Sequence, residues 1–426
     1  MYFKPSYLPH NDVAYDLVSS LAETLGLRLN KKIEIILASY LATAKKAKGK
    51  AFDWWTGNDN KTLKFWSLFD HVSNQSVREV YKLLKEHEYI GASAYVPDTT
   101  VELMGIGIPN WIVAKNLPNQ TLEEATFIEA NLPYVLVNKK EEYEDKLARR
   151  KHNRTAPKLG IKHVKKRFGR AYSRAYRPVK EMNSYWAKHP LHNPITNEFY
   201  SSARRIFHNA SIKSGGRWYG GWMEYSSNQR FSFTIDNHPI VQVDVNAMIL
   251  SLLSALTGKP MNTGSNSGAY EDAYQAVVCQ IPNVTNARKK VKQVIMELTG
   301  TGNASKCKPS PDSKILEEEF TYIRDLCLQA YPALECLDNK RFNFPNDLSY
   351  HESNILTQTL LSLKEQGVVA YPVHDCVIVK QGREDDAVDT FRRVFKEYVN
   401  VDFDIALSVE SNPSNKVRIE GRHSIV

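Results

Sequence analysis

Two aspartates interrupt strongly apolar, β-branched segments. Asp244 follows alternating valines in "PIVQVDV", and Asp375 lies in "YPVHDCVIVK", residues 371–380. A charged carboxylate beside a buried strand is costly unless it is paired or binds a metal. If both strands end at one place, the pair can hold two Mg²⁺ ions, one activating an attacking hydroxyl and one stabilising a leaving pyrophosphate. The alternatives are that Asp244 caps a helix and that Asp375 is a solvated turn residue.

A cationic pattern lies between the two aspartates, in "NARKKVKQVIMELTGTGNASK", residues 286–306. Arg288, Lys292 and Met296 are four residues apart and would share one face of a helix. The residues available to bury another face are Val291, Val294, Ile295 and Leu298. A cationic face directed at metal-binding carboxylates suits the phosphates of a nucleoside triphosphate. An ordinary amphipathic surface helix would show the same pattern.

The flanking elements are predicted from periodicity. Val241, Val243 and Val245 alternate as in a strand, and residues 246–257 have helical composition before Gly258 ends the helix. Asp375 is predicted in a strand, turn, strand unit. The two carboxylates therefore stand at the ends of core strands, where they can meet.

The order of these segments resembles the core motifs of family A DNA polymerases and their relatives, the single-subunit phage-type RNA polymerases. "VDVNAMILSLLSAL" is similar to the first palm motif, "RKKVKQVIMELTG" to the fingers helix and "VHDCVIV" to the second palm motif. The blocks "GGRWYGG" and "YHESNILTQTLLSLKEQGVVAYPVHD" resemble a compact transposon-virus polymerase branch. The resemblance covers about residues 205–400 and implies an α/β (α+β) fold with a right-hand polymerase palm and fingers.

The resemblance also implies roles for individual residues. Asp244 and Asp375 would be the metal carboxylates, with the backbone carbonyl of Val245 as a further ligand of Mg²⁺, for which Mn²⁺ is a possible substitute. Arg288 and Lys292 would bind the incoming triphosphate, and Lys292 would donate a proton to the departing pyrophosphate. The nucleic-acid contacts would come from Arg217 on the template-primer duplex, from His374 at the primer terminus or a backbone phosphate, and from the region of Glu352.

The implied activity is template-directed DNA synthesis in replication of a mobile element, virus or phage. Its partners would be template-primer DNA or single-stranded DNA and nucleoside triphosphates, with a helicase as a further possible partner. Two alternatives stay open. One is a primase-polymerase or RNA polymerase that makes primers de novo, and the other is a non-enzymatic DNA-binding replication initiator.

Sugar choice is open because the sequence departs from the DNA-making members. Ile249 stands where they usually have Glu, Gly300 stands where they have Tyr, and Met296 replaces their usual aromatic residue and resembles the RNA-polymerase version. Ile249 would still exclude a ribose 2′-hydroxyl by bulk if it occupies that place.

The basic excess of the chain is local. The formal net charge is +9, yet residues 146–180 hold 14 Lys and Arg residues and no Asp or Glu, so the remainder is net acidic. Phe168, Tyr172 and Tyr176 recur every four residues and would form a helical stripe. The candidate nucleic-acid contacts are Lys165, Lys166, Arg167, Arg170 and Arg174. Such a helix could bind a phosphate backbone or stack on unpaired bases, and the alternative is a solvated linker.

Three parts are expected along the chain: residues 1–112, a helical connector over 113–200 that ends in the basic segment, and the core over 201–426. In the first part, residues 62–71 and 74–90 read as helices, with Ser73 or Asn74 as N-cap. Two short strands within 91–107 follow. This order indicates a winged helix that would lay Gln75, Arg78 and Lys82 in a DNA groove, and a small helical core is the alternative.

Composition excludes several classes. No run of about 18 apolar residues exists and the first residues lack the apolar stretch of a signal peptide, so no membrane partner is expected and the expected location is intracellular, in the host cytoplasm for a virus or phage. The five cysteines show no CxxC spacing and are expected to be reduced thiols.

Overall fold

The structure is a computed structural model that describes most of the chain. The described residues are 3, 5–54, 72–92, 110–129, 134–142, 145, 156–259, 272–310, 313–338, 346–412 and 415–419. The helix expected at 62–71, the turn at Pro97-Asp98 and most of the two strands predicted within 91–107 lie outside them. The chain forms two compact units. Unit 1 holds residues 1–205, 220–225 and 232–237, and unit 2 holds 206–219, 226–231 and 238–426.

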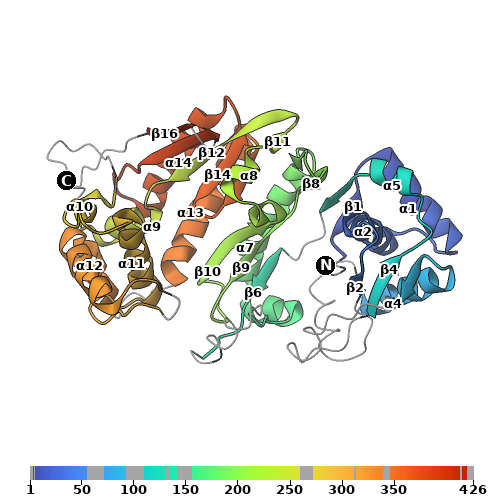
Figure 1. The fold of residues 1–426 in the computed structure, drawn as a ribbon, viewed down its shortest axis with the longest axis horizontal. Helices are drawn as coiled ribbons and strands as arrows, with labels where there is room; N and C mark the ends of the chain where they lie inside the picture. The colour runs from blue at the N-terminus through green and yellow to red at the C-terminus, as the bar shows by residue number, and fades with distance from the viewer. Residues whose placement is uncertain are drawn as a thin grey trace. The chain divides into compact units, whose positions relative to one another are not determined.

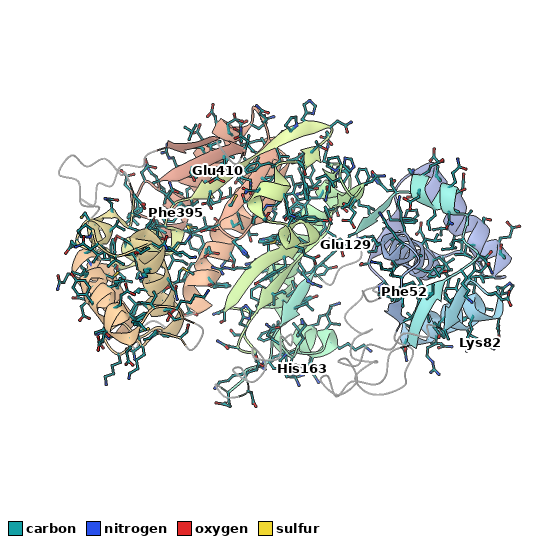
Figure 2. All side chains as sticks on the ribbon, in the orientation of Figure 1. Phe52, Lys82, Glu129, His163, Phe395 and Glu410 are labelled. Atoms are coloured by element: carbon teal, nitrogen blue, oxygen red, sulfur yellow. The ribbon has the colours of Figure 1, made fainter. Side chains whose placement is uncertain are left out.

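Unit 1 begins with helices and a small sheet (Figure 1). Its first elements are β1 (Tyr7–Pro9), α1 (Asp12–Thr24), α2 (Lys31–Ala47), β2 (Phe52–Trp54), α4 (Asn74–Glu86), β3 (Ile90–Ala92), β4 (Asn110–Ala114) and α5 (Asn119–Glu124). The predicted cap is confirmed, since the Ser73 side chain accepts the Ser76 N–H at the start of α4. β4 pairs antiparallel with both β2 and β3. In Figure 2, Phe52 lies inside this part while Lys82 projects from α4 into solvent.

The rest of unit 1 combines short strands with one long helix. The elements are β5 (Phe127–Glu129), β6 (Val135–Val137), α7 (Ile161–Trp186), β7 (Leu191–Asn193), β8 (Glu198–Tyr200), η1 (Gly221–Glu224) and β11 (Thr234–Ile235). The order β1-β5-β8-β7-β11 forms a sheet that is antiparallel except at β5 and β8. The helical connector expected over 113–200 therefore contains short strands as well as helices α5 and α7. Strands β5, β6, β7 and β8 have three residues each, too few to show a period of two.

Unit 2 is built on an antiparallel sheet in the order β13-β14-β12-β15-β16. Its strands are β12 (His238–Val245), β13 (Ala370–Val373), β14 (Cys376–Lys380), β15 (Leu407–Asn412) and β16 (Asn415–Ile419), and its helices are α8 (Ser227–Arg230), α9 (Met248–Thr257), α10 (Gln275–Val278), α11 (Ala287–Thr301), α12 (Glu317–Ala330), η2 (Pro332–Asp338), α13 (Asn346–Glu365) and α14 (Glu384–Val399). Strands β9 (Ala203–Phe207) and β10 (Gly215–Gly220) contain residues of both units.

Within unit 2, α14 packs on β12 and β14 while α13 packs on β13, and α13 also contacts α9 and α14. Helices α10, α11 and α12 contact one another and form a separate helical group (Figure 1). The predicted strand over Val241–Val245 and the end of the next helix at Gly258, which has a positive φ of 66°, are confirmed. The mixed α/β class is confirmed as well. None of the helices in the described part of the chain combines the length and hydrophobicity needed to cross a bilayer.

Candidate active site

The sheet of unit 2 brings the two aspartates to the same end of neighbouring strands. Asp244 on β12 is in register with Cys376, the first residue of β14. The next residue, Val245, donates its N–H to the Asp375 carbonyl oxygen at 3.3 Å. Both aspartates are only half-buried. The two aspartates therefore stand on neighbouring strands at the same end of the sheet, where solvent reaches both.

The hairpin between β13 and β14 turns through two residues, His374 and Asp375. His374 has a φ of 56°, a left-handed conformation of the kind that a two-residue hairpin loop requires. His374 is exposed at the tip, yet nearby protein atoms that displace water, followed by the charge of Arg217, lower the pKa of its imidazole despite Asp375. The ring is therefore held toward its neutral form beside the carboxylate.

The donor set fits magnesium better than zinc. Mg²⁺ binds through one or two carboxylates and keeps water and substrate phosphate oxygens as its other ligands. Across the described residues, no three His, Cys, Asp or Glu side chains gather as a metal-ligand set, whereas structural zinc sites use four such ligands. Burial raises the pKa of the Cys376 thiol well above its ordinary value, and Asp244 and Asp375 raise it further. Cys376 thus stays neutral and leaves the two carboxylates as donors.

Helix α11 exposes the cationic face that the sequence predicts. Arg288, Lys292 and Met296 are all exposed, and Met296 is 45% accessible. The opposite face, which is formed by Val291, Val294, Ile295 and Leu298, is buried. Lys292 makes no ion pair within the described part of the chain. Gly300 is exposed near the end of the helix, and Ile249 lies half-buried in the first turn of α9.

Two residues that sequence reasoning missed surround Arg288. The Nε of Arg288 donates to Asp272 at 2.5 Å, and its guanidinium lies 5.2 Å from the centre of the Tyr274 ring. Burial, which is the main cause, raises the pKa of Tyr274 to about 12, and the charges of Asp375 and Asp244 also raise it. Tyr274 is therefore an electrostatic neighbour of both the arginine and the two carboxylates.

Arg217 forms a buried ion pair with Glu352. Its Nε and Nη2 each donate to one carboxylate oxygen of Glu352 at 2.7 Å, and the Glu352 side chain is 1% exposed. Burial raises the pKa of Glu352 although Arg217 opposes this. Burial alone would lower the pKa of Arg217, but Glu352 and Asp375 raise it. The pair stands between β10 and α13 as an electrostatic neighbour of Asp375.

Two more side-chain bonds fasten β10 to α13. Ser353 donates its hydroxyl to the Gly215 carbonyl at 2.9 Å, and the Trp218 indole donates to Thr357 at 2.9 Å. Unit 2 thus brings together Asp244, Val245, Asp375, His374, Arg217 and Glu352, and Tyr274 links Arg288 to this group. The signal that could have identified Asp272 and Tyr274 is weak, since one acid and one aromatic ahead of a helix are common.

The basic segment lies on α7 in unit 1. Lys165, Lys166, Arg167, Arg170 and Arg174 are all exposed. The predicted aromatic stripe instead faces the protein in part, because Tyr172 is buried and its ring lies 5.6 Å from that of Tyr176, which in turn contacts Tyr134 at 5.1 Å. Tyr172 therefore cannot stack on a base, and the phosphate-binding alternative depends on the cations. Helix α7 kinks at Gly169, where φ is 45°.

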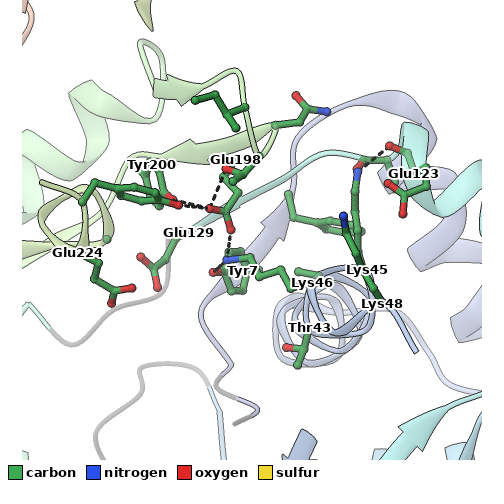
Figure 3. Close-up of a pocket in the computed structure, with 18 residues that line it drawn as sticks. Tyr7, Thr43, Lys45, Lys46, Lys48, Glu123, Glu129, Glu198, Tyr200 and Glu224 are labelled. Atoms are coloured by element: carbon green, nitrogen blue, oxygen red, sulfur yellow. Dashed lines mark hydrogen bonds and ion pairs between the residues drawn. The ribbon is translucent and has the colours of Figure 1, made fainter. Parts of the chain in front are cut away.

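A cavity of about 690 Å³ lies within unit 1, and none of the candidate site residues described above lines it (Figure 3). On one wall, the Tyr200 and Tyr225 hydroxyls donate to Glu198 at 2.5 and 2.9 Å, and Lys46 pairs with the same carboxylate. Lys45 donates to the backbone oxygens of Glu123 and Ala125. Because these polar groups bond to one another, the cavity wall is a structural network, and the candidate active site remains the pair of aspartates.

Comparison with known proteins gives little further information. No family model and no curated protein matches the chain. Among solved structures, one match is the POL domain of Pol1 from M. smegmatis in complex with DNA primer-template and dNTP, with 10% identity, a TM-score of 0.32, and coverage of 96% of this chain and 67% of that one. A superposition at this level identifies neither the family nor the activity of this chain.

Proposed function

We propose that the chain is a template-directed nucleotidyltransferase, a DNA polymerase of family A type that uses Mg²⁺. The observation that carries the proposal is the placement of Asp244 and Asp375 at one end of two hydrogen-bonded strands, where both are half-buried and the charge of Asp375 acts on Arg217. Two carboxylates brought to one solvent-reached end of neighbouring strands are the kind of oxygen donors that Mg²⁺ binds together with water and substrate phosphates.

In this proposal different side chains bind the metal ions, the triphosphate and the nucleic acid. Asp244 and Asp375, with the Val245 carbonyl, hold the metal ions, and bound Mg²⁺ supplies activation of the primer hydroxyl and stabilisation of the pyrophosphate. Arg288 and Lys292 bind the triphosphate, with Lys292 as proton donor to the pyrophosphate. Neutral His374 contacts the primer terminus. Arg217 keeps Nη1 free of Glu352 and directs it at the duplex.

Unit 1 supplies contacts to nucleic acid outside the catalytic centre. The exposed cations of α7 suit a phosphate backbone, since each neutralised phosphate releases counterions. We also propose that α2, β2, α4, β3 and β4 form a winged helix. The strand order β2-β4-β3 and the exposed Gln75, Arg78 and Lys82 on α4 support this assignment.

The test is an extension assay on single-stranded template with Mg²⁺, with and without primer, offering dNTPs and NTPs separately. We expect primer-dependent dNTP incorporation that is lost in Asp244→Ala and Asp375→Ala, while both variants keep DNA affinity. Unprimed products containing ribonucleotides would instead identify a primase-polymerase. DNA binding without synthesis under any condition would contradict the enzyme proposal and favour the replication initiator.

A further inference from the structure

The surroundings of Arg288 point to a dedicated positioning device. We propose that Asp272 and Tyr274 form a clamp that fixes the Arg288 guanidinium in the orientation in which it binds the triphosphate. Asp272 is then a positioning residue, because it acts through Arg288, and Tyr274 is its planar support. This inference rests on the proposed function and adds two residues to the nucleotide site that the motifs do not contain.

The clamp holds Arg288 on two sides. The Asp272 carboxylate accepts the Arg288 Nε at 2.5 Å and its Nη2 at 3.4 Å, while the Tyr274 ring supports the guanidinium at 5.2 Å. Asp272 is itself anchored, since its Oδ1 also accepts the Tyr274 backbone N–H at 3.2 Å. Tyr274 is 6% exposed. Both parts of the clamp are thus fixed by the fold before any nucleotide arrives.

The geometry leaves part of the guanidinium available to a ligand. Arginine has five N–H donors in a rigid fork, and Asp272 engages the edge formed by Nε and Nη2. The Nη1 edge remains, and the Arg288 side chain is 53% exposed whereas that of Asp272 is only 15% exposed. Fixing a flexible side chain in its binding orientation reduces the entropy that binding would otherwise cost.

The clamp and the two aspartates belong to the same unit of the chain, and the charges of Asp244 and Asp375 act on Tyr274. If Asp272 acted only through its charge, its substitution would change the affinity for a triphosphate in the opposite direction. If Asp272 only neutralised Arg288, removing its charge would strengthen the attraction to a triphosphate. The direction of the change on substitution therefore separates positioning from neutralisation.

The experiment measures KM for dNTP and kcat in primed extension, together with equilibrium binding of a fluorescent dNTP to the full-length protein with primer-template. We expect Asp272→Asn to raise KM and the dissociation constant roughly tenfold, a change of about 1.4 kcal/mol, with a smaller effect on kcat. Asp272→Glu should recover part of the loss. Tyr274→Leu, which removes the ring, should raise the dissociation constant more than Tyr274→Phe, which keeps the ring.

The matched control is Glu319→Gln. Glu319 lies on α12 and pairs at 2.6 Å with Lys290, a cation on the same helix α11 as Arg288. A KM that is unchanged or lower in Asp272→Asn would overturn the clamp, as would an equal rise of KM in Glu319→Gln. If Asp375→Ala abolishes extension while Asp272→Asn binds dNTP normally, only the clamp fails. If the wild-type protein neither extends primers nor binds dNTP, the proposed function fails.

Discussion

At the scale of single residues, Lys292 and Arg288 share one exposed helix face but differ in their partners. Arg288 is held by Asp272, whereas Lys292 makes no ion pair in the described part of the chain. An unpaired lysine can approach a phosphate and deliver a proton, which suits the proposed proton donor.

We therefore expect Lys292→Ala to lower kcat by roughly 100-fold, the range measured for loss of a general acid, and to weaken dNTP binding as well. Single-turnover extension at saturating dNTP measures the first effect. Lys290→Ala is the control, since Lys290 lies two positions from Lys292 and therefore on another side of α11, where it pairs with Glu319. Equal rates for Lys292→Ala and the wild type would remove Lys292 from the site.

Arg217 makes a contact in the structure that its sequence motif does not predict. The motif indicates a direct duplex contact, but the structure adds a two-bond ion pair to Glu352, which is 135 positions away in the chain. Such a distant pairing has no local signal. It means that Arg217 also joins β10 to α13, so its substitution would leave the buried Glu352 carboxylate unpaired in addition to removing the proposed DNA contact.

At the scale of elements, α7 carries a cationic surface on a helix whose other face is core. The residues on the buried face include Val164, Tyr172, Val179 and Trp186. Neutralising Lys165, Lys166, Arg170 and Arg174 to Gln should leave this core intact while weakening DNA binding.

If all four cations contact phosphates, the slope of log affinity against log salt should become shallower by about 2.8 on single strands, at roughly 0.7 per contact. Titration of labelled oligonucleotide at several salt concentrations measures the slope. Lys139→Gln with Lys140→Gln provides the control, because these lysines are exposed and lie outside α7 and outside the proposed winged helix. A slope that stays at the wild-type value would show that α7 does not contact the phosphates.

Elements with a strong local pattern were the predictable ones. Strand β12, the turn at Asp375, the Ser73 cap and the buried face of α11 follow from periodicity and capping chemistry alone. Three-residue strands such as β7 and β8 could not be predicted, because their pairing partners decide their conformation. The orientation of Tyr172 was missed for a related reason: an aromatic stripe on a helix fits a core as well as it fits a nucleic acid.

At the scale of the whole molecule, unit 1 is joined by one polar network (Figure 3). Lys46 on α2 donates to the Tyr7 hydroxyl at 2.7 Å and pairs with Glu198 on β8, which accepts the hydroxyls of Tyr200 and Tyr225. Burial alone would raise the pKa of Glu198, but Lys46 and the two tyrosines hold it below the ordinary value. Segments far apart in sequence therefore depend on one ionised carboxylate.

This dependence predicts how stability changes with pH. A carboxyl whose pKa is lower in the folded chain stabilises it above the unfolded pKa, near 4.3, and this contribution is lost as pH falls through the folded value. Glu198→Gln should lower the free energy of unfolding at pH 7 by about 2 kcal/mol, through loss of charged hydrogen bonds, and the gap to wild type should narrow below about pH 4.

Denaturant unfolding between pH 7 and 3 measures the gap, and Glu224→Gln is the matched control, because Glu224 lines the same cavity but is exposed. If the difference in free energy of unfolding between the wild type and Glu198→Gln stays constant down to pH 3, the charge of Glu198 does not contribute to stability. The proposed clamp and the two candidate catalytic aspartates belong to unit 2, so neither Gln variant should change dNTP binding at pH 7. A change there would show that unit 1 acts on the nucleotide site as well as on its own fold.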